Sequence, residues 1–256
     1  KSFSVSTGAN TAAQKVVVYG PGGIGKTELC SLMSQVGMKP LFIDVGDSSK
    51  FLDVKRIGPD LLQSLEDLRD CLHDEALLSG YDAIILDDLT KIEELAARWV
   101  IQNVPHQEKE SKPIKSIEDY GWGKGYSHIY DAMLLLLQDL DAHIRRGRWV
   151  VCVAHECTNT VPNPSGEDWI RYEPRLQSPA SGKASVRLRV KEWCDHLLFI
   201  GYDVMVTDGR GKGSGTRTIY PNETPICMAK SRSLSDQIVY ERGSCELWNL
   251  LKGTKS

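Results

Sequence analysis

The run Gly20-Pro21-Gly22-Gly23-Ile24-Gly25-Lys26-Thr27 follows the pattern G-x-x-x-x-G-K-T. Its glycines permit a tight turn in which successive backbone N–H groups point at one anion. Residues 15–19 are mostly β-branched and predict a buried strand, and residues 28–35 predict a helix whose free N–H groups face the loop. A strand, a glycine-rich loop and a helix in this order predict a phosphate-binding loop.

The residues of this loop have distinct expected roles. Lys26 is expected to reach the β- and γ-phosphates of a nucleotide, and the Thr27 hydroxyl is expected to ligate Mg²⁺. A glycine-rich turn that matches by chance is the alternative, but the flanking strand and helix argue against it. The expected nucleotide-binding residues are Gly20, Pro21, Gly22, Gly23, Ile24, Gly25, Lys26, Thr27 and Glu28.

The composition is that of an ordinary globular protein. Of the 256 residues, 41% are hydrophobic and 25% are charged, and a net charge of −3 gives no overall field that attracts nucleic acid. The seven cysteines lack C-x-x-C spacing, which favours reduced thiols in a cytosolic protein. No apolar run is long enough to span a membrane. We expect a disordered lead-in over residues 1–14 and a single domain over 15–256.

Residues 83–88, with the sequence AIILDD, form a second candidate motif. Four apolar residues followed by Asp predict a buried strand that ends in a carboxylate, which is the form of a Walker B segment. Asp87 is expected to hold the water shell of Mg²⁺. A strand that merely ends in a polar turn is the alternative, and the upstream phosphate loop favours the functional interpretation.

The remaining hydrophobic patterns alternate between strands and helices. Strands are expected over 41–45, 149–154, 196–206 and 226–229, and helices over 60–78, 91–102, 124–146 and 245–252. This alternation predicts an α/β fold in which helices cover a mostly parallel sheet. A glycine-rich hairpin tip over 207–216 predicts an antiparallel extension near the C-terminus.

Several local details follow from the same patterns. Asp60 is expected to cap the helix over 60–78, and Thr90 with Glu93 is expected to form a capping box for the helix over 91–102. Two long polar segments, 103–123 and 157–183, are expected to be irregular loops. Segment 185–193 is either a helix or a strand.

Six short motifs, taken in order, point to a known family. They are GPGGIGKT (20–27), FIDVGDSS (42–49), IILDDLT (84–90), YGWGKGYSHIYD (120–131), VVCVAHE (150–156) and CMAKSR (227–232). This set resembles the RecA-like P-loop ATPases and, more closely, the phage nucleotide-binding proteins of that superfamily, which include RecA-core single-strand annealing recombinases. The resemblance covers roughly residues 15–232 and implies a RecA-like core that binds and hydrolyses ATP with Mg²⁺.

The resemblance also implies catalytic roles. His155 matches the position of a polar γ-phosphate sensor, although a structural, hydrogen-bonded histidine is the alternative. Lys230 and Arg232 match a basic pair that RecA-like oligomers insert into a neighbour's nucleotide site, where positive charge stabilises the γ-phosphate in the transition state. Two solvated surface charges are the alternative for this pair.

One departure from the family concerns the residue that activates water. RecA proteins usually place this Glu just after the second strand, where this chain has Gly46. Asp47 and Asp88 are the candidate bases, and a shorter carboxylate reaches less far toward the water. Asp44 is a third candidate, which we interpret instead as a partner of Thr27 or of the Mg²⁺ shell. Hydrolysis is therefore expected to be slow, or to be stimulated by DNA or by oligomer formation.

The resemblance places the DNA path along the loops 103–123 and 157–183. The second loop and the residues after it combine aromatic and basic side chains, which suit single strands because every base offers a face for stacking. A solvated loop with packed aromatics is the alternative. The expected DNA-binding residues are Trp169, Arg171, Tyr172, Arg175, Lys183 and Arg187, together with Arg210 and Lys212 of the hairpin tip.

Three functions share these nucleotide motifs. The first is an ATPase that binds single-stranded DNA and promotes annealing or homologous recombination in a phage. The second is an ATP-dependent motor or loader that acts on duplex DNA or on replication proteins, and the third is a small-molecule kinase. For the first, the expected partners are single-stranded DNA, further copies of the chain in a ring or filament, and a single-strand binding protein. No membrane is expected, and the expected location is the bacterial host cytoplasm.

Overall fold

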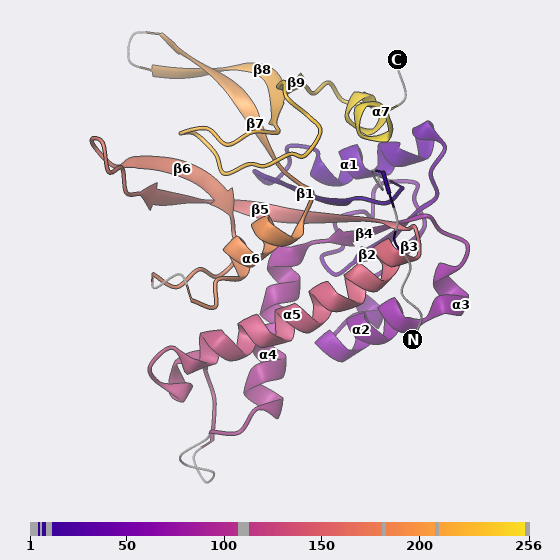
Figure 1. Ribbon diagram of the computed structural model, residues 1–256, viewed down its shortest axis with the longest axis vertical. Helices are drawn as coiled ribbons and strands as arrows, with labels where there is room; N and C mark the ends of the chain where they lie inside the picture. Colours follow the sequence, from indigo (N-terminus) through magenta and orange to yellow (C-terminus); the bar gives the residue numbers. More distant parts are fainter. Residues whose placement is uncertain are drawn as a thin grey trace.

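The computed structural model describes residues 5, 7–8, 12–106, 113–180, 183–207 and 210–253, without the side chains of 204–207 and 210–214. Within these residues, one sheet has the strand order β3-β2-β4-β5-β1-β7-β8-β9, with β6 paired to β5 (Figure 1). The strands are β1 (Lys15–Gly20), β2 (Pro40–Asp44), β3 (Arg56–Ile57), β4 (Ala83–Asp87), β5 (Trp149–Val161), β6 (Trp169–Pro174), β7 (His196–Thr207), β8 (Arg210–Tyr220) and β9 (Ile238–Val239). The helices are α1 (Lys26–Ser31), α2 (Leu65–His73), α3 (Glu75–Leu78), α4 (Leu89–Asn103), α5 (Lys124–Arg145), α6 (Val186–Trp193) and α7 (Glu246–Lys252).

Strands β1, β2, β3, β4, β5 and β7 run parallel, whereas β6, β8 and β9 pair antiparallel. The predicted fold class is therefore confirmed in its architecture: an α/β fold with a mostly parallel sheet and antiparallel strands near the C-terminus. Among the described residues, no helix combines the length and the apolar character needed to cross a bilayer.

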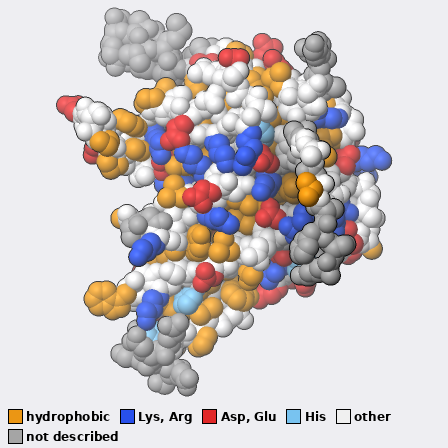
Figure 2. Space-filling model, viewed as in Figure 1, with side chains coloured by type: hydrophobic (Ala, Val, Ile, Leu, Met, Phe, Trp, Pro, Cys, Tyr) orange, Lys and Arg blue, Asp and Glu red, His pale blue; other side chains and the backbone are white. Residues whose placement is uncertain are grey.

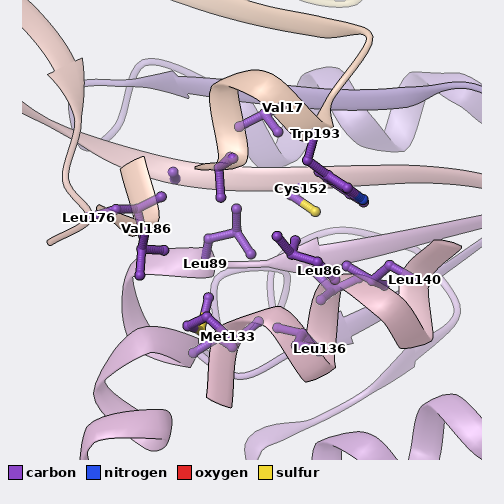
Figure 3. Close-up of a cluster of buried hydrophobic side chains, with 14 of the residues drawn as sticks. Val17, Leu86, Leu89, Met133, Leu136, Leu140, Cys152, Leu176, Val186 and Trp193 are labelled. Atoms are coloured by element: carbon purple, nitrogen blue, oxygen red, sulfur yellow. The ribbon is translucent and has the colours of Figure 1, made fainter. Parts of the chain in front are cut away.

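Alternating side chains of the buried strands build two cores, one on each face of the sheet. Val17 and Tyr19 of β1 face the core covered by α2, α4, α5 and α6, part of which is shown in Figure 3. Val16 and Val18 face the core covered by α1 and α7. In this second core, the indole Nε1 of Trp248 in α7 donates to the carbonyl of Leu29 in α1 at 2.6 Å.

The register of the parallel strands places the predicted motifs at one edge. Gly20 at the end of β1 lies opposite His155 of β5, and Asp44 at the end of β2 lies opposite Asp87 of β4. The carboxyl ends of these strands meet here, which is where open α/β sheets bind their ligands.

Helix starts differ from the sequence expectations because other side chains provide the caps. The expected helix over 60–78 begins only at Leu65, where Ser64 and Asp67 form a capping box, and Asp60 lies in a preceding 3₁₀ turn. Asp74 then caps the separate helix α3. Leu61 lies in the same 3₁₀ turn and is 72% exposed.

The predicted capping box of Thr90 and Glu93 is also wrong. The side chain of Asp88 caps α4 by accepting the N–H of Lys91 at 2.8 Å. The hydroxyl of Thr90 instead accepts the backbone N–H of His155, and the Glu93 carboxylate accepts the backbone N–H of Gln177. Both side chains hydrogen-bond to backbone groups far away in the sequence, and no local sequence pattern indicates these partners.

The second predicted loop is largely a hairpin. Strand β5 continues seven residues beyond 154 to Val161 and pairs with β6 from Glu156↔Pro174 to Val161↔Trp169. Segment 185–193 is resolved as a helix, α6, because the Ser185 hydroxyl caps it at the N–H of Leu188. Residues 226–229 form no continuous strand, and only isolated bridges join Cys227 to Tyr172 and Lys230 to Leu197.

Two further boundaries differ. The predicted hairpin tip over 207–216 is mostly strand, since β7 and β8 pair up to Thr207↔Arg210, and residues 208–209 lie outside the described part of the chain. Of the predicted lead-in, residues 1–4, 6 and 9–11 also lie outside it. Residues 12–14 contact the domain: the carbonyl of Ala12 accepts the Trp149 indole N–H, and the Gln14 amide donates to the carbonyl of Leu251.

Candidate nucleotide site

The phosphate loop borders a cavity of about 410 Å³ at the carboxyl edge of the sheet. Gly25 precedes α1 with a left-handed φ of 104°, a conformation that favours glycine, and its carbonyl accepts the N–H of Leu29 at 2.8 Å. The free N–H groups at the start of α1 therefore point toward the cavity. The cavity is lined by Gly22, Gly23, Gly25, Lys26, Thr27, Glu28, Ser48, Phe51, Leu52, Asp87, Val153, His155 and Arg242.

Lys26 is buried, and within the described part of the chain its ammonium donates only to carbonyl oxygens. Nζ donates to the carbonyl oxygens of Gly20 at 2.7 Å and Pro21 at 2.8 Å. Burial lowers the pKa of Lys26, while nearby Glu156 and Asp87 act in the opposite direction. A phosphate in the cavity would give this desolvated cation the anionic partner that the loop itself does not provide.

Thr27 and Asp87 present two adjacent oxygens. The Thr27 hydroxyl donates to Asp87 Oδ2 at 2.6 Å. Burial raises the pKa of Asp87 to about 6, against the lowering effect of the Thr27 hydrogen bond. Hard oxygen donors fit Mg²⁺, which keeps several of its waters and needs few protein ligands. In the described part of the chain, no group of three His, Cys, Asp or Glu side chains forms a more complete metal site.

Asp44 shapes the loop that follows β2. Its Oδ1 accepts the N–H groups of Gly46 and Ser48, and its Oδ2 accepts both the N–H and the hydroxyl of Ser49. This buried carboxylate fixes the loop so that Ser48 lines the cavity. All four of these hydrogen bonds are to residues of this loop, and Asp44 makes none to Thr27, which bonds to Asp87 instead.

The two candidate bases of the sequence analysis lie in different surroundings. Asp47 has a left-handed φ of 58°, is half exposed and pairs with Lys50 Nζ at 3.1 Å, and it does not line the cavity. Asp88 is buried, and its Oδ2 lies 3.4 Å from Nε2 of His155. The structure thus brings Asp88, but not Asp47, to the neighbourhood of His155.

His155 lies where β5 leaves the sheet, and both of its backbone groups are held. Its N–H donates to the Thr90 hydroxyl at 3.2 Å, and its carbonyl accepts the N–H of Arg175 at 2.8 Å. The imidazole lines the cavity and is one-third exposed. Burial lowers the pKa of His155 and keeps the ring neutral at pH 7, against the raising effect of Asp88.

Sequence reasoning missed five residues that line the cavity, namely Ser48, Phe51, Leu52, Val153 and Arg242. Phe51 follows the β2 loop and is 88% exposed, so its ring can stack on a base. Arg242 comes from the far end of the chain and pairs through Nε with Oε2 of Glu28 at 3.3 Å. The nearby Tyr240 hydroxyl donates to the carbonyl of Gly25 at 3.4 Å. Phe51 could have been noticed as an apolar residue in a polar loop, but no local signal indicates Arg242.

A family model described as an AAA domain matches residues 12–233. The chain belongs to this AAA domain family. A KaiC-like protein from the hyperthermophilic archaeon Pyrococcus horikoshii OT3 is similar at 9% sequence identity, over 89% of this chain and 85% of that chain, with a TM-score of 0.45. No curated protein matches the chain significantly.

The two expected trans residues of this AAA domain lie away from its own nucleotide cavity. Lys230 Nζ donates to the carbonyls of Lys191, Glu192 and Cys194 at the end of α6. Arg232 is 64% exposed and pairs with Asp195 at 3.0 Å. Asp195 precedes β7 and accepts the N–H of the first residue of β1, so Arg232 lies at the opposite end of the strands from the phosphate loop.

The expected DNA-binding residues fall into two groups. Arg171 and Arg187 both pair with the buried carboxylate of Glu173, so this AAA domain uses them internally. Tyr172 stacks on Phe199 with ring centroids 5.0 Å apart.

The second group is more accessible. Arg175 and Lys183 are exposed, and Trp169 is partly exposed on β6. Arg210 and Lys212 belong to β8, but their side chains lie outside the described part of the structure.

A further exposed aromatic residue was missed. Trp122 is fully exposed and has a left-handed φ of 49°, between Gly121 at 70° and Gly123 at 72°. Left-handed backbone is uncommon for a bulky residue and marks a candidate functional position. The two flanking glycines in the sequence were the available signal.

Proposed function

We propose that this AAA domain hydrolyses ATP and couples hydrolysis to binding of single-stranded DNA, in the service of annealing or homologous recombination in a phage. The observation that carries the proposal is strand β5. It lines the nucleotide cavity with Val153 and His155 and continues without a break into the hairpin with β6. One continuous strand thus joins the nucleotide cavity to the hairpin, which gives the proposed coupling a direct physical connection.

Several side chains of the cavity have a part in the proposed hydrolysis. Lys26 neutralises charge on the β- and γ-phosphates, and the N–H groups at the start of α1 hold the phosphate oxygens. Thr27 and Asp87 hold Mg²⁺, which when bound neutralises charge on the same phosphates. Phe51 stacks on the base, and Arg242, paired with Glu28, lines the same cavity.

Exposed groups near the hairpin support the DNA-binding part. The segment after β6 carries the exposed Arg175 and Lys183 and is tied to the start of α5, because the Gln177 amide donates to the carbonyls of Tyr126 and Ala184. Trp122 lies two residues before α5. An exposed aromatic ring and nearby cations suit a single strand, whose bases stack and whose phosphates need positive charge.

Self-assembly is part of the proposal. Arg232 cannot reach the phosphate loop of its own chain, because the length of β1, ~3.3 Å per residue, separates the two. Its exposed guanidinium can reach the nucleotide of a neighbouring copy once the pair with Asp195 opens. Lys230, which caps α6, keeps the segment that carries Arg232 in place. A bacterial host cytoplasm is the corresponding location.

The test is ATP turnover at increasing protein concentration, with and without single-stranded DNA. We expect turnover per chain to rise with concentration and with DNA. Stimulation by duplex DNA alone would favour a motor or loader, and transfer of phosphate to a metabolite without DNA would favour a kinase. A rate independent of both concentration and DNA would contradict the proposal.

A further inference from the structure

The cavity offers no uncommitted carboxylate for the attacking water among the residues that the structure describes. Gly46 has no side chain where RecA-like proteins carry Glu, and Asp47 faces Lys50 outside the cavity. The two carboxylates that line the cavity are engaged, Glu28 with Arg242 and Asp87 with Thr27. A general base must come within hydrogen-bond reach of the water whose proton it takes.

We propose that His155 is the general base of this site and that Asp88 is its positioning residue. The inference rests on the proposed ATP hydrolysis. The imidazole lines the same cavity as Lys26 and Thr27, and Nε2 lies 3.4 Å from Asp88 Oδ2. A carboxylate at this ion-pair distance favours a proton on Nε2, and the other nitrogen, Nδ1, is then the acceptor.

Both members of this pair are held by groups outside it. Asp88 Oδ1 accepts the N–H of Lys91 as the cap of α4, so its Oδ2 is presented to the ring. The backbone of His155 is fixed by Thr90 on one side and by Arg175 on the other. A base fixed in this way loses little freedom when it takes the proton.

The charges around the ring suit a neutral base. The groups that face His155 are Asp88 at the start of α4, Lys26 of α1, Arg175 after β6 and Glu156 on β5. Burial and the two cations lower the pKa of His155, so its lone pair is available at neutral pH. Asp88 then stabilises the imidazolium that forms.

The step balances as an in-line displacement. The water oxygen forms a bond to the γ-phosphorus while the bond from that phosphorus to the β–γ bridging oxygen breaks. The electron pair of the broken bond stays on ADP, and one water proton passes to Nδ1 of His155. The products are ADP and inorganic phosphate, and the proton leaves His155 for solvent after phosphate departs.

The experiment compares the wild-type chain with His155→Gln, His155→Ala and Asp88→Asn, with Mg-ATP at saturation and single-stranded DNA present. Gln can still hydrogen-bond a phosphate as a sensor does, but it cannot accept a proton. We expect His155→Gln to lower kcat roughly 10²–10⁴-fold, the usual contribution of a general base. Excess imidazole should partly restore turnover to His155→Ala.

The pH profile separates a base from a structural histidine. Wild-type kcat should rise with pH through the pKa of His155 and then level off, and His155→Gln should lose this limb. Asp88→Asn keeps a good helix cap, so the fold is retained. Its acidic limb should move to lower pH because the group that raises the pKa of His155 is gone.

Three outcomes overturn the proposal in distinguishable ways. Turnover by His155→Gln within about threefold of wild type, with the same pH profile, leaves His155 only a sensor. Loss of turnover in Glu156→Gln, with His155→Gln active, assigns the base to Glu156. If the wild-type chain binds a fluorescent ATP analogue but never turns ATP over, the proposed hydrolysis itself fails, and the base fails with it.

Discussion

The nucleotide cavity and the β5–β6 hairpin share one strand, but their charges are arranged in opposite ways. In the cavity, Lys26 is buried with only carbonyl partners, and Asp87 is buried with a raised pKa. At the hairpin, Arg171 of β6 and Arg187 of the neighbouring α6 both pair with Glu173, and Arg171 also pairs with Glu223. On the face in Figure 2, basic side chains lie next to acidic ones and form no uninterrupted basic stripe. The buried ammonium of Lys26, which has no hydrogen-bonded carboxylate, therefore indicates an anion-binding site, whereas the many charged residues of segment 171–191 do not by themselves indicate one.

The largest expected effect tests the hairpin side of this comparison. Glu173→Ala removes a buried carboxylate, leaving Arg187 without a carboxylate partner and Arg171 with only the exposed Glu223, and should lower the free energy of unfolding by about 3–5 kcal/mol. Urea unfolding measures it. The matched control is Glu192→Ala, an exposed carboxylate 3.7 Å from Arg189, which should cost less than about 1 kcal/mol. Equal losses of unfolding free energy in both variants would mean that the ion pairs of Glu173 do not stabilise the hairpin.

The next effect tests the cavity. Lys26→Ala removes the cation from the phosphate loop and should lower ATP turnover roughly 10²–10³-fold. It should have little effect on folding, because the ammonium hydrogen-bonds to the carbonyls of Gly20 and Pro21 and not to a carboxylate. Steady-state phosphate release measures it. Lys39→Ala, an exposed lysine before β2, is the control. Unchanged turnover in Lys26→Ala would remove the basis of the nucleotide site.

A pH series sharpens the comparison further. The pKa of Asp87 is about 6 in the folded chain, and an unfolded Asp titrates at about 3.9. Between these values the folded chain binds more protons than the unfolded chain, so the stability that Asp87 contributes is lost as pH rises from about 4 to about 6. The loss is up to about 3 kcal/mol, at about 1.4 kcal/mol per pKa unit.

Asp87→Asn isolates this contribution. The difference in unfolding free energy between the wild-type chain and this variant, measured without nucleotide, should change across that pH range. Mg²⁺ with nucleotide should flatten the change, because a bound cation favours the ionised carboxylate. If the unfolding free energies of the wild-type chain and of Asp87→Asn change with pH in parallel, the pKa of Asp87 is not raised in the folded chain.

The smallest expected effect concerns Trp122. If a base stacks on its exposed ring, Trp122→Ala should weaken binding of single-stranded DNA by ~1–3 kcal/mol and leave ATP affinity unchanged. Fluorescence anisotropy with a labelled oligonucleotide measures it. Leu61→Ala removes another exposed apolar side chain and serves as the control. Equal DNA affinity in both variants would exclude Trp122 from the binding surface.

Local patterns predicted the parts of the fold that depend on neighbours in sequence. The phosphate loop, the strand that ends at Asp87 and the long helix α5 all lie where the residues indicated. Each of these elements carries its own signal, namely glycine spacing, an apolar run before a carboxylate, or a helical hydrophobic period. Helices α2 and α4 began elsewhere because Ser64 and Asp88 cap them, and α1, which has no side-chain cap, begins two residues before the expected residue 28.

The parts that could not be predicted depend on partners far away in the chain. Glu173 neutralises Arg171 from two residues away and Arg187 from fourteen, but its burial is set by the hairpin, which was expected to be a loop. Arg242 reaches the cavity from beyond the last strand. Whether a charge is buried, paired or free is decided by tertiary packing, and no periodicity in the sequence records it.

The hydrogen bond from Trp248 to the carbonyl of Leu29 has a consequence for the order in which the chain can fold during synthesis. It joins residues 219 positions apart, and β1, an early strand, is flanked by β5 and β7, which emerge much later from the ribosome. The helix behind the phosphate loop therefore gains its packing partner only when α7 has been translated. Contacts of such separation slow folding, and a nascent chain that still lacks α7 should be a client for chaperones before it can hold a nucleotide.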